Sequence, residues 1–129
     1  DARYFLYCEE VDLFYRLAKR GYVFWRIAAA RGTHFIGHGE AMSEMRLLYR
    51  AAGVMQFVRL HWSVPKQLLA FILQWLGAWQ RVLLGVLVGR WSDHLHLVGL
   101  SNRALALRPN HWRFGYDKER GLLSRLTER

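Results

Sequence analysis

The sequence predicts the end of an α/β domain followed by a mainly helical extension, and three observations support this class. Residues 9–20 carry apolar side chains at helical spacing, and residues 22–27 are β-branched and aromatic, which is typical of a strand. From residue 43 onward the pattern is mostly helical. One strand with several helices makes an incomplete domain, so we predict a mostly α-helical chain divided into residues 1–60 and 61–129.

Local signals define the first elements. Gly21 follows the first helix, where a left-handed residue commonly ends a helix. Residues 28–43 contain several glycines and predict a loop. Ser43 is a candidate N-cap for a helix over residues 44–61, because its hydroxyl can accept a hydrogen bond from a free N–H of the first turn.

The second half predicts further helices. Pro65 suits the first turn of a helix that extends to about residue 88. Another helix is expected over residues 93–107, because Pro109 disfavours helical backbone at the residue before it. The last twenty residues are basic and less patterned, with a short helix expected from residue 117 onward.

Composition and charge limit the function classes. Hydrophobic residues make up 53% of the 129 residues, which excludes a disordered tail. The formal net charge of +9 predicts an anionic partner: a phosphate-bearing substrate, nucleic acid or an acidic membrane surface. Nucleic acid is disfavoured, because no helix-turn-helix, RNA-binding or zinc motif accompanies the basic residues. Cys8 is the only cysteine, so no internal disulfide can form.

The start of the first predicted helix carries three carboxylates, Glu9, Glu10 and Asp12. Negative charge is favourable there, because the free backbone N–H groups make that end of a helix positive. Two interpretations remain open from the pattern alone. The carboxylates may only support the helix, with Asp12 and Arg16 as an i,i+4 ion pair, or one of them may act as a general base toward a hydroxyl group.

Residues 4–13, YFLYCEEVDL, together with Arg16 and Gly21, resemble the acidic motif of family 2 glycosyltransferases, especially the bacterial rhamnosyltransferase-like group. The resemblance implies a GT-A fold over residues 1–60. It also implies that Glu10 is the catalytic base and that Glu9 orients the base or the acceptor. Asp12 and Arg16 are expected mainly to support the helix, with substrate binding as their alternative role.

The same resemblance gives the histidines of the predicted loop a role. Taken alone, His34 and His38 are a weak signal, because no Cys or Asp lies beside them. The resemblance implies that His34 helps to bind Mg²⁺ or Mn²⁺ and that His38 lies near the donor phosphates. None of the four aspartates forms the Asp-x-Asp motif of the family. We therefore expect that motif, and the nucleotide-binding half, in sequence upstream of this chain.

Residues 68–88 are long and apolar enough to span a bilayer, with Arg81 as the only charged side chain. An arginine near the bilayer centre costs about 2.5–3.5 kcal/mol on insertion scales, which argues against a simple span. We expect this helix to lie in the headgroup region, or to pack on the catalytic domain or on a second subunit in a homo-oligomer.

Together these features predict the C-terminal part of an inverting hexosyltransferase. The donor is a nucleotide-sugar and the acceptor a glycan or lipid-linked hydroxyl, as expected in bacterial cell-surface polysaccharide synthesis. The predicted location is the cytoplasm, at the inner face of the cell membrane. The alternative is a non-enzymatic basic helical module associated with a membrane surface.

Overall fold

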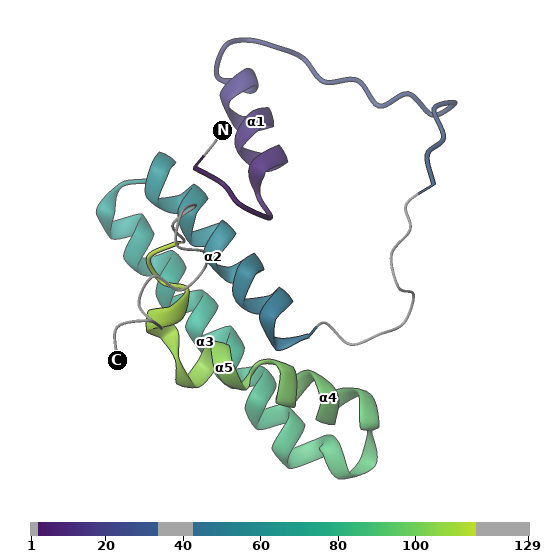
Figure 1. Cartoon of the computed structure of the whole chain (residues 1–129), viewed down its shortest axis with the longest axis vertical. Helices are drawn as coiled ribbons and strands as arrows, with labels where there is room; N and C mark the ends of the chain where they lie inside the picture. The colour runs from purple at the N-terminus through teal and green to yellow at the C-terminus, as the bar shows by residue number, and fades with distance from the viewer. Residues whose placement is uncertain (1–2, 34–42, 116–129) are drawn as a thin grey trace.

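The computed structural model describes residues 3–33 and 43–115, which are mostly helical and contain no strand (Figure 1). This confirms the prediction of a mostly α-helical chain. Short 3₁₀ turns, η1 and η2, follow α3 and α5. In order, the elements are α1 (Glu9–Ala18), α2 (Glu44–His61), α3 (Val64–Val88), η1 (Gly89–Trp91), α4 (Asp93–Ser101), α5 (Arg103–Leu107) and η2 (Pro109–His111).

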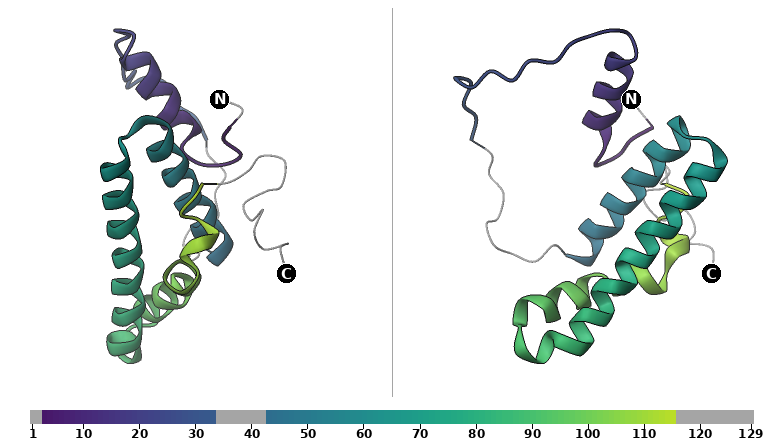
Figure 2. Two further views of the ribbon diagram at one scale, coloured as in Figure 1. Left: turned by 90° about the vertical axis from the view of Figure 1, so that its left-hand side faces the viewer. Right: turned by 180° about the vertical axis from the view of Figure 1, so that it is seen from behind.

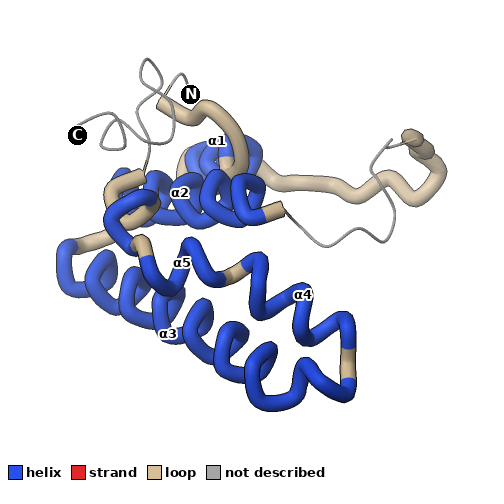
Figure 3. Tube along the Cα trace, turned by 60° about the horizontal axis from the view of Figure 1, so that its bottom comes forward, coloured by secondary structure: helices blue, strands red, loops and turns tan. Residues whose placement is uncertain are grey.

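The long helices α2 and α3 form an antiparallel hairpin, and α4 and α5 return along α3 (Figures 1 and 2). Helix α1 lies outside this unit, beside the C-terminal part of α2. The tube in Figure 3 shows residues 19–33 leading away from α1 as an extended loop. The acidic motif is therefore attached to one side of a helical unit.

The predicted helix starts are confirmed where capping chemistry defines them. The Ser43 hydroxyl accepts a hydrogen bond from the backbone N–H of Arg46 at 3.4 Å, so α2 begins at Glu44. Ser92 caps α4 in the same way, through the N–H of Leu95. Pro65 lies in the first turn of α3, where its missing N–H costs no hydrogen bond.

The core of this helical unit combines buried alanines with tryptophans that donate hydrogen bonds to α5. Trp112 is fully buried and donates from its indole N–H to the Leu105 carbonyl at 3.0 Å. Trp75 donates in the same way to the Ala106 carbonyl at 2.9 Å, so the aromatic face of α3 packs on α5. The buried core consists of Leu48, Ala51, Ala52, Met55, Ala78, Ala104, Leu105, Ala106 and Trp112.

Helices α3 and α4 come into backbone contact at two glycines. A Cβ added to Gly85 would lie 2.7 Å from the Gly99 Cα and 2.9 Å from the Leu95 carbonyl oxygen. Real Cβ atoms do not approach backbone atoms this closely. Glycine at both positions therefore sets the distance between these two helices.

The predicted strand over residues 22–27 is wrong for this structure. These residues form no regular element, and Trp25 is 87% exposed. A strand requires a neighbouring strand to satisfy its backbone N–H and carbonyl groups, and the described residues provide none. The β-prone composition is present, but the partner is not.

The predicted continuous helix over residues 93–107 is divided at Asn102. This residue is buried, and its side-chain amide donates to the carbonyl of Val98 at 2.8 Å. Such local side-chain bonds compete with the regular helical ladder. The break separates α4 from α5, which packs against both α2 and α3.

We predict that Gly85→Ala lowers the free energy of unfolding by about 1–3 kcal/mol, because neither backbone atom near the new Cβ can move independently. Denaturant unfolding followed by circular dichroism measures the change. Gly77→Ala is the matched control in the same helix, since its Cβ would meet only the flexible end of Arg81. The control should be neutral or gain up to about 1 kcal/mol from helix propensity. Equal effects of both variants would contradict the close-packing argument.

Candidate functional site

The candidate site is the first turn of α1, where Glu9 and Glu10 both lie exposed to solvent. Cys8 occupies the N-cap position and makes no side-chain capping hydrogen bond. The free N–H groups at this helix end therefore favour the negative charge of the two carboxylates. Both carboxylates are accessible to a ligand.

The backbone leading into this turn is unusual. Tyr7 and Cys8 have φ angles of 68° and 66°, so two consecutive residues other than glycine adopt the left-handed conformation. Each such residue costs on the order of 1–3 kcal/mol and persists only where its surroundings hold it. This segment determines the direction in which the first turn of α1, with its two glutamates, leaves the preceding chain.

Gly53 of α2 provides one of the contacts that hold this segment. A Cβ at position 53 would lie 2.7 Å from the carbonyl oxygen of Tyr7 and 3.2 Å from that of Leu6. Only glycine allows the backbone of residues 6–7 to lie directly on α2. Nearby, the ring of Phe5 contacts that of Tyr49, with centroids 5.6 Å apart. The strained segment is thus packed against a long, regular helix.

Asp12 provides the second anchor. Its side chain is fully buried, and its carboxylate oxygens lie 2.7 Å from Arg16 Nε and 2.5 Å from His61 Nε2. The Tyr4 hydroxyl donates to the same carboxylate at 3.4 Å. Three partners from three different parts of the chain therefore satisfy one buried charge, as burial of a carboxylate requires.

These partners set the protonation of the cluster. Burial raises the pKa of the Asp12 carboxyl, but the hydrogen bonds from His61 and Arg16 outweigh it and hold the pKa below its ordinary value. Burial, and then the negative charge of Asp12, raise the pKa of the Tyr4 hydroxyl. Asp12 is consequently ionised at neutral pH, while Tyr4 remains a neutral hydrogen-bond donor.

Aromatic rings surround this ionic cluster on the α1–α2 side. The Tyr15 ring contacts His61 and Phe57, with centroid distances of 4.6 and 5.3 Å, and Phe57 lies 4.8 Å from His61. Lys19 lies over the Tyr15 ring at 4.7 Å. The rings limit the access of water to the His61–Asp12 pair, which strengthens it.

The structure can be compared with the predicted site residues one by one. Glu9 and Glu10 lie together on the exposed first turn. The predicted ion pair between Asp12 and Arg16 is confirmed. Because the Asp12 carboxylate is enclosed and has three partners, its geometry favours the supporting role over contact with a substrate.

The predicted histidine ligands, His34 and His38, lie outside the described residues. Among the residues that are described, no group of three or more His, Cys, Asp or Glu side chains could hold a metal ion. Glu9 and Glu10 supply oxygen atoms of the type that Mg²⁺ and Mn²⁺ prefer, but two carboxylates alone do not form a complete site.

The sequence alone assigned no role in this site to His61, Gly53 or Tyr4, although Tyr4 belongs to the quoted motif. His61 lies 49 positions after Asp12, and a single histidine at the end of a helix carries no pattern. Gly53 could have been noticed as a glycine within a helix, where it lowers stability unless packing requires it. Its contact with residues 6–7 is visible only in the structure.

Comparison of the chain with protein-family models, with curated proteins and with solved structures found no match.

We predict that stability falls as the pH is lowered below about 4. Asp12 has a lowered pKa in the folded state, so the unfolded chain, with an ordinary pKa near ~3.9, takes up its proton first. The contribution of this group is present above that pH and is lost as the pH falls through the folded-state pKa. Thermal unfolding between pH 3 and pH 7 measures it.

Asp12→Asn should lower the free energy of unfolding at pH 7 by about 2–3 kcal/mol and flatten the acid decline, because buried charge-assisted hydrogen bonds are lost while Arg16 stays partly solvated. Asp93→Asn is the control, since this exposed residue only complements the start of α4 and should cost about 0.3–1 kcal/mol. An unchanged acid profile in Asp12→Asn would show that other groups cause the decline.

Proposed function

We propose that this chain is the C-terminal part of an inverting glycosyltransferase of the family 2 type, which transfers a sugar from a nucleotide-sugar donor to a hydroxyl acceptor. The observation that supports the proposal is the pair of exposed carboxylates on the first turn of α1, directly after the strained residues Tyr7 and Cys8. The turn is anchored by Gly53 on one side and by buried Asp12 on the other. Strained, firmly held backbone beside accessible titratable groups is typical of functional sites.

In this proposal, Glu10 acts as the general base. Its carboxylate accepts the proton of the acceptor hydroxyl while the oxygen forms a bond to the anomeric carbon of the donor. The bond between that carbon and the nucleotide diphosphate breaks at the same time, and the configuration of the carbon inverts. Glu9, the neighbouring carboxylate, orients the acceptor or the base. The proton ends on Glu10 and the electron pair on the departing diphosphate.

The loop after α1 also supports a larger catalytic domain. Tyr22, Val23, Phe24, Trp25 and Ile27 are all exposed, with fractions between 46% and 87%. A contiguous exposed apolar segment of β-prone residues generally marks a surface that pairs with another part of a protein. We infer that residues 22–27 pack against an upstream nucleotide-binding half.

A metal ion would take part in the proposed reaction only in the complete enzyme. Mg²⁺ or Mn²⁺ would neutralise the charge of the departing diphosphate, and His34 is the residue proposed to help bind it. His38 is proposed to lie near the donor phosphates.

The test restores the upstream sequence and measures sugar transfer by the purified protein. Glu10→Gln should lower kcat by about 10²–10⁴-fold, because the amide cannot accept the proton while its shape is almost unchanged. Glu44→Gln is the matched control, an exposed glutamate in the first turn of α2, and should retain full activity. Undiminished transfer by Glu10→Gln would remove this residue from the base role.

A second candidate, the membrane-associated helical module, is favoured by the outer face of α3. In the described part of the chain, one helical stretch, Val64–Trp91, is long and apolar enough to cross a bilayer, with a mean hydropathy of 1.5. Leucines at helical spacing are exposed along it, while the tryptophan face packs on α5. The exposed set is Leu69, Leu73, Leu76, Leu83 and Leu87.

We propose that this leucine face lies in the headgroup region of a membrane, parallel to the surface. The position is compatible with either function, since an enzyme with a lipid-linked acceptor and a non-enzymatic module both need it. Lys66, in the first turn of α3, could then keep its charge in the headgroup region rather than in the hydrocarbon.

For this arrangement, alkaline carbonate should release the restored full-length protein from isolated membranes into the supernatant, because surface binding of a helix is reversible. The measurement is the distribution of the protein between pellet and supernatant, with a known spanning protein as reference. Retention in the pellet would show that α3 crosses the bilayer.

A further inference from the structure

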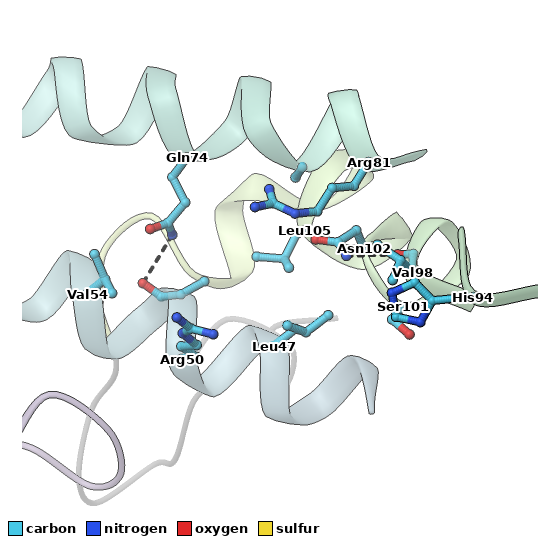
Figure 4. Close-up of a pocket in the computed structure, with 12 residues that line it drawn as sticks. Leu47, Arg50, Val54, Gln74, Arg81, His94, Val98, Ser101, Asn102 and Leu105 are labelled. Carbon is cyan, nitrogen blue, oxygen red and sulfur yellow. Dashed lines mark hydrogen bonds between the residues drawn. The ribbon is translucent and has the colours of Figure 1, made fainter. Parts of the chain in front are cut away.

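A separate cavity, which the glutamates of α1 do not line, lies between α2, α3, α4 and α5 (Figure 4). Its volume is about 490 Å³. Two arginines that are exposed to solvent line it, Arg50 from α2 and Arg81 from α3. The close-up shows Arg81 extending from α3 and His94 of α4 at the far end. Among the residues that the structure describes, no aspartate or glutamate lines the cavity.

The described residues that line this cavity carry two positive charges and no negative charge. Arg81 uses one guanidinium nitrogen to donate to the Gly77 carbonyl at 2.8 Å, which leaves its other N–H groups free. Arg50 has no ion-pair partner among the described residues. Two positive groups facing one cavity without an acid repel each other, and an anion between them converts this repulsion into attraction.

The shape of the donors indicates which anion fits. A guanidinium group presents its N–H donors as a planar fork, which matches the oxygens of a phosphate, and a second arginine can bind the remaining oxygens. The cavity also has an apolar wall formed by Leu47, Val54 and Leu105. Its volume exceeds that of a single phosphate, so a ligand with an apolar part beside the phosphate uses both kinds of surface.

We propose that this cavity binds the phosphate or diphosphate group of an amphiphilic ligand. The site is distinct from the carboxylates of α1 and does not depend on the proposed transferase reaction. Two features connect the cavity to its surroundings. The exposed leucine face of α3 belongs to the same helix as Arg81, and Arg50 lies close enough to Cys8, the N-cap residue of α1, for its charge to act on the thiol.

Arg50 and the acidic turn both affect the pKa of Cys8. Burial raises the pKa of its thiol, and the charges of Glu10 and Glu9 raise it further, whereas Arg50 lowers it. Arg50 and the two glutamates therefore act on one side chain. An anion bound at Arg50 would lie within electrostatic range of the acidic turn.

The experiment compares two variants of the whole chain that carry the same net charge. Arg50→Gln/Arg81→Gln removes both cavity arginines. Arg20→Gln/Arg46→Gln removes two cations that are also exposed but lie outside the cavity and outside α3. Isothermal titration calorimetry with inorganic pyrophosphate gives the dissociation constants, and circular dichroism verifies that both variants are folded.

We expect the cavity variant to weaken pyrophosphate binding by about tenfold or more, because two charge-assisted contacts are lost, and the control variant by less than about twofold. Equal weakening by both variants would overturn the proposal, since it would show a diffuse response to net charge. Absence of measurable binding by the unaltered chain at millimolar pyrophosphate would overturn it as well.

A second arm identifies the source of the phosphate. Sedimentation with vesicles of phosphatidylglycerol and phosphatidylcholine measures binding to lipid-borne phosphate. If the cavity variant loses vesicle binding more than the control does, the cavity takes a lipid headgroup; if it loses only pyrophosphate binding, the cavity takes a soluble phosphate ligand. Both readouts are binding, so the result is independent of whether Glu10 proves to be a base.

Discussion

The buried carboxylate of Asp12 is the constraint on which the arrangement of the acidic turn depends. Its ion pair with Arg16 lies within α1, but its contact with His61 joins α1 to the end of α2, and Tyr4 joins both to the chain that precedes them. A charge enclosed in this way cannot lose a partner cheaply, because the remaining groups would be buried without compensation. The cost of separation therefore keeps α1 in place, although few other contacts connect it to the helical unit.

One anchor would leave α1 free to pivot, and Gly53 supplies the second. The backbone of residues 6–7 lies directly on α2 at this glycine, so the strained pair of Tyr7 and Cys8 is held between two fixed points. Left-handed conformations at two consecutive residues of this kind would relax in a loose loop. Their persistence indicates that the packing on α2 and the Asp12 cluster together supply more free energy than the strain costs.

The sequence predicts what is local and fails where contacts are distant. Helix starts at Ser43 and Pro65 follow from capping chemistry, and the Asp12–Arg16 pair follows from spacing along one helix. The strand predicted over residues 22–27 had the right composition but required a partner that the described residues lack. The break at Asn102 depended on whether its amide turned back toward the helix. His61 could not be assigned to Asp12 because nothing in the intervening residues encodes their proximity.

Different faces of helix α2 contact the acidic turn of α1 and line the cationic cavity. Gly53, Phe57 and His61 recur every four residues, and this stripe meets α1 and the segment before it. Its core residues, such as Ala51 and Met55, face the helical unit on another side. Arg50 precedes Gly53 by one turn and lines the cationic cavity, which places it between the two regions. Arg50 also lowers the pKa of the Cys8 thiol, against the larger effects of burial and of the two glutamates, so its charge acts on the residue that precedes the acidic turn. One helix therefore carries both the contacts that hold α1 and an arginine of the cavity, about one turn apart.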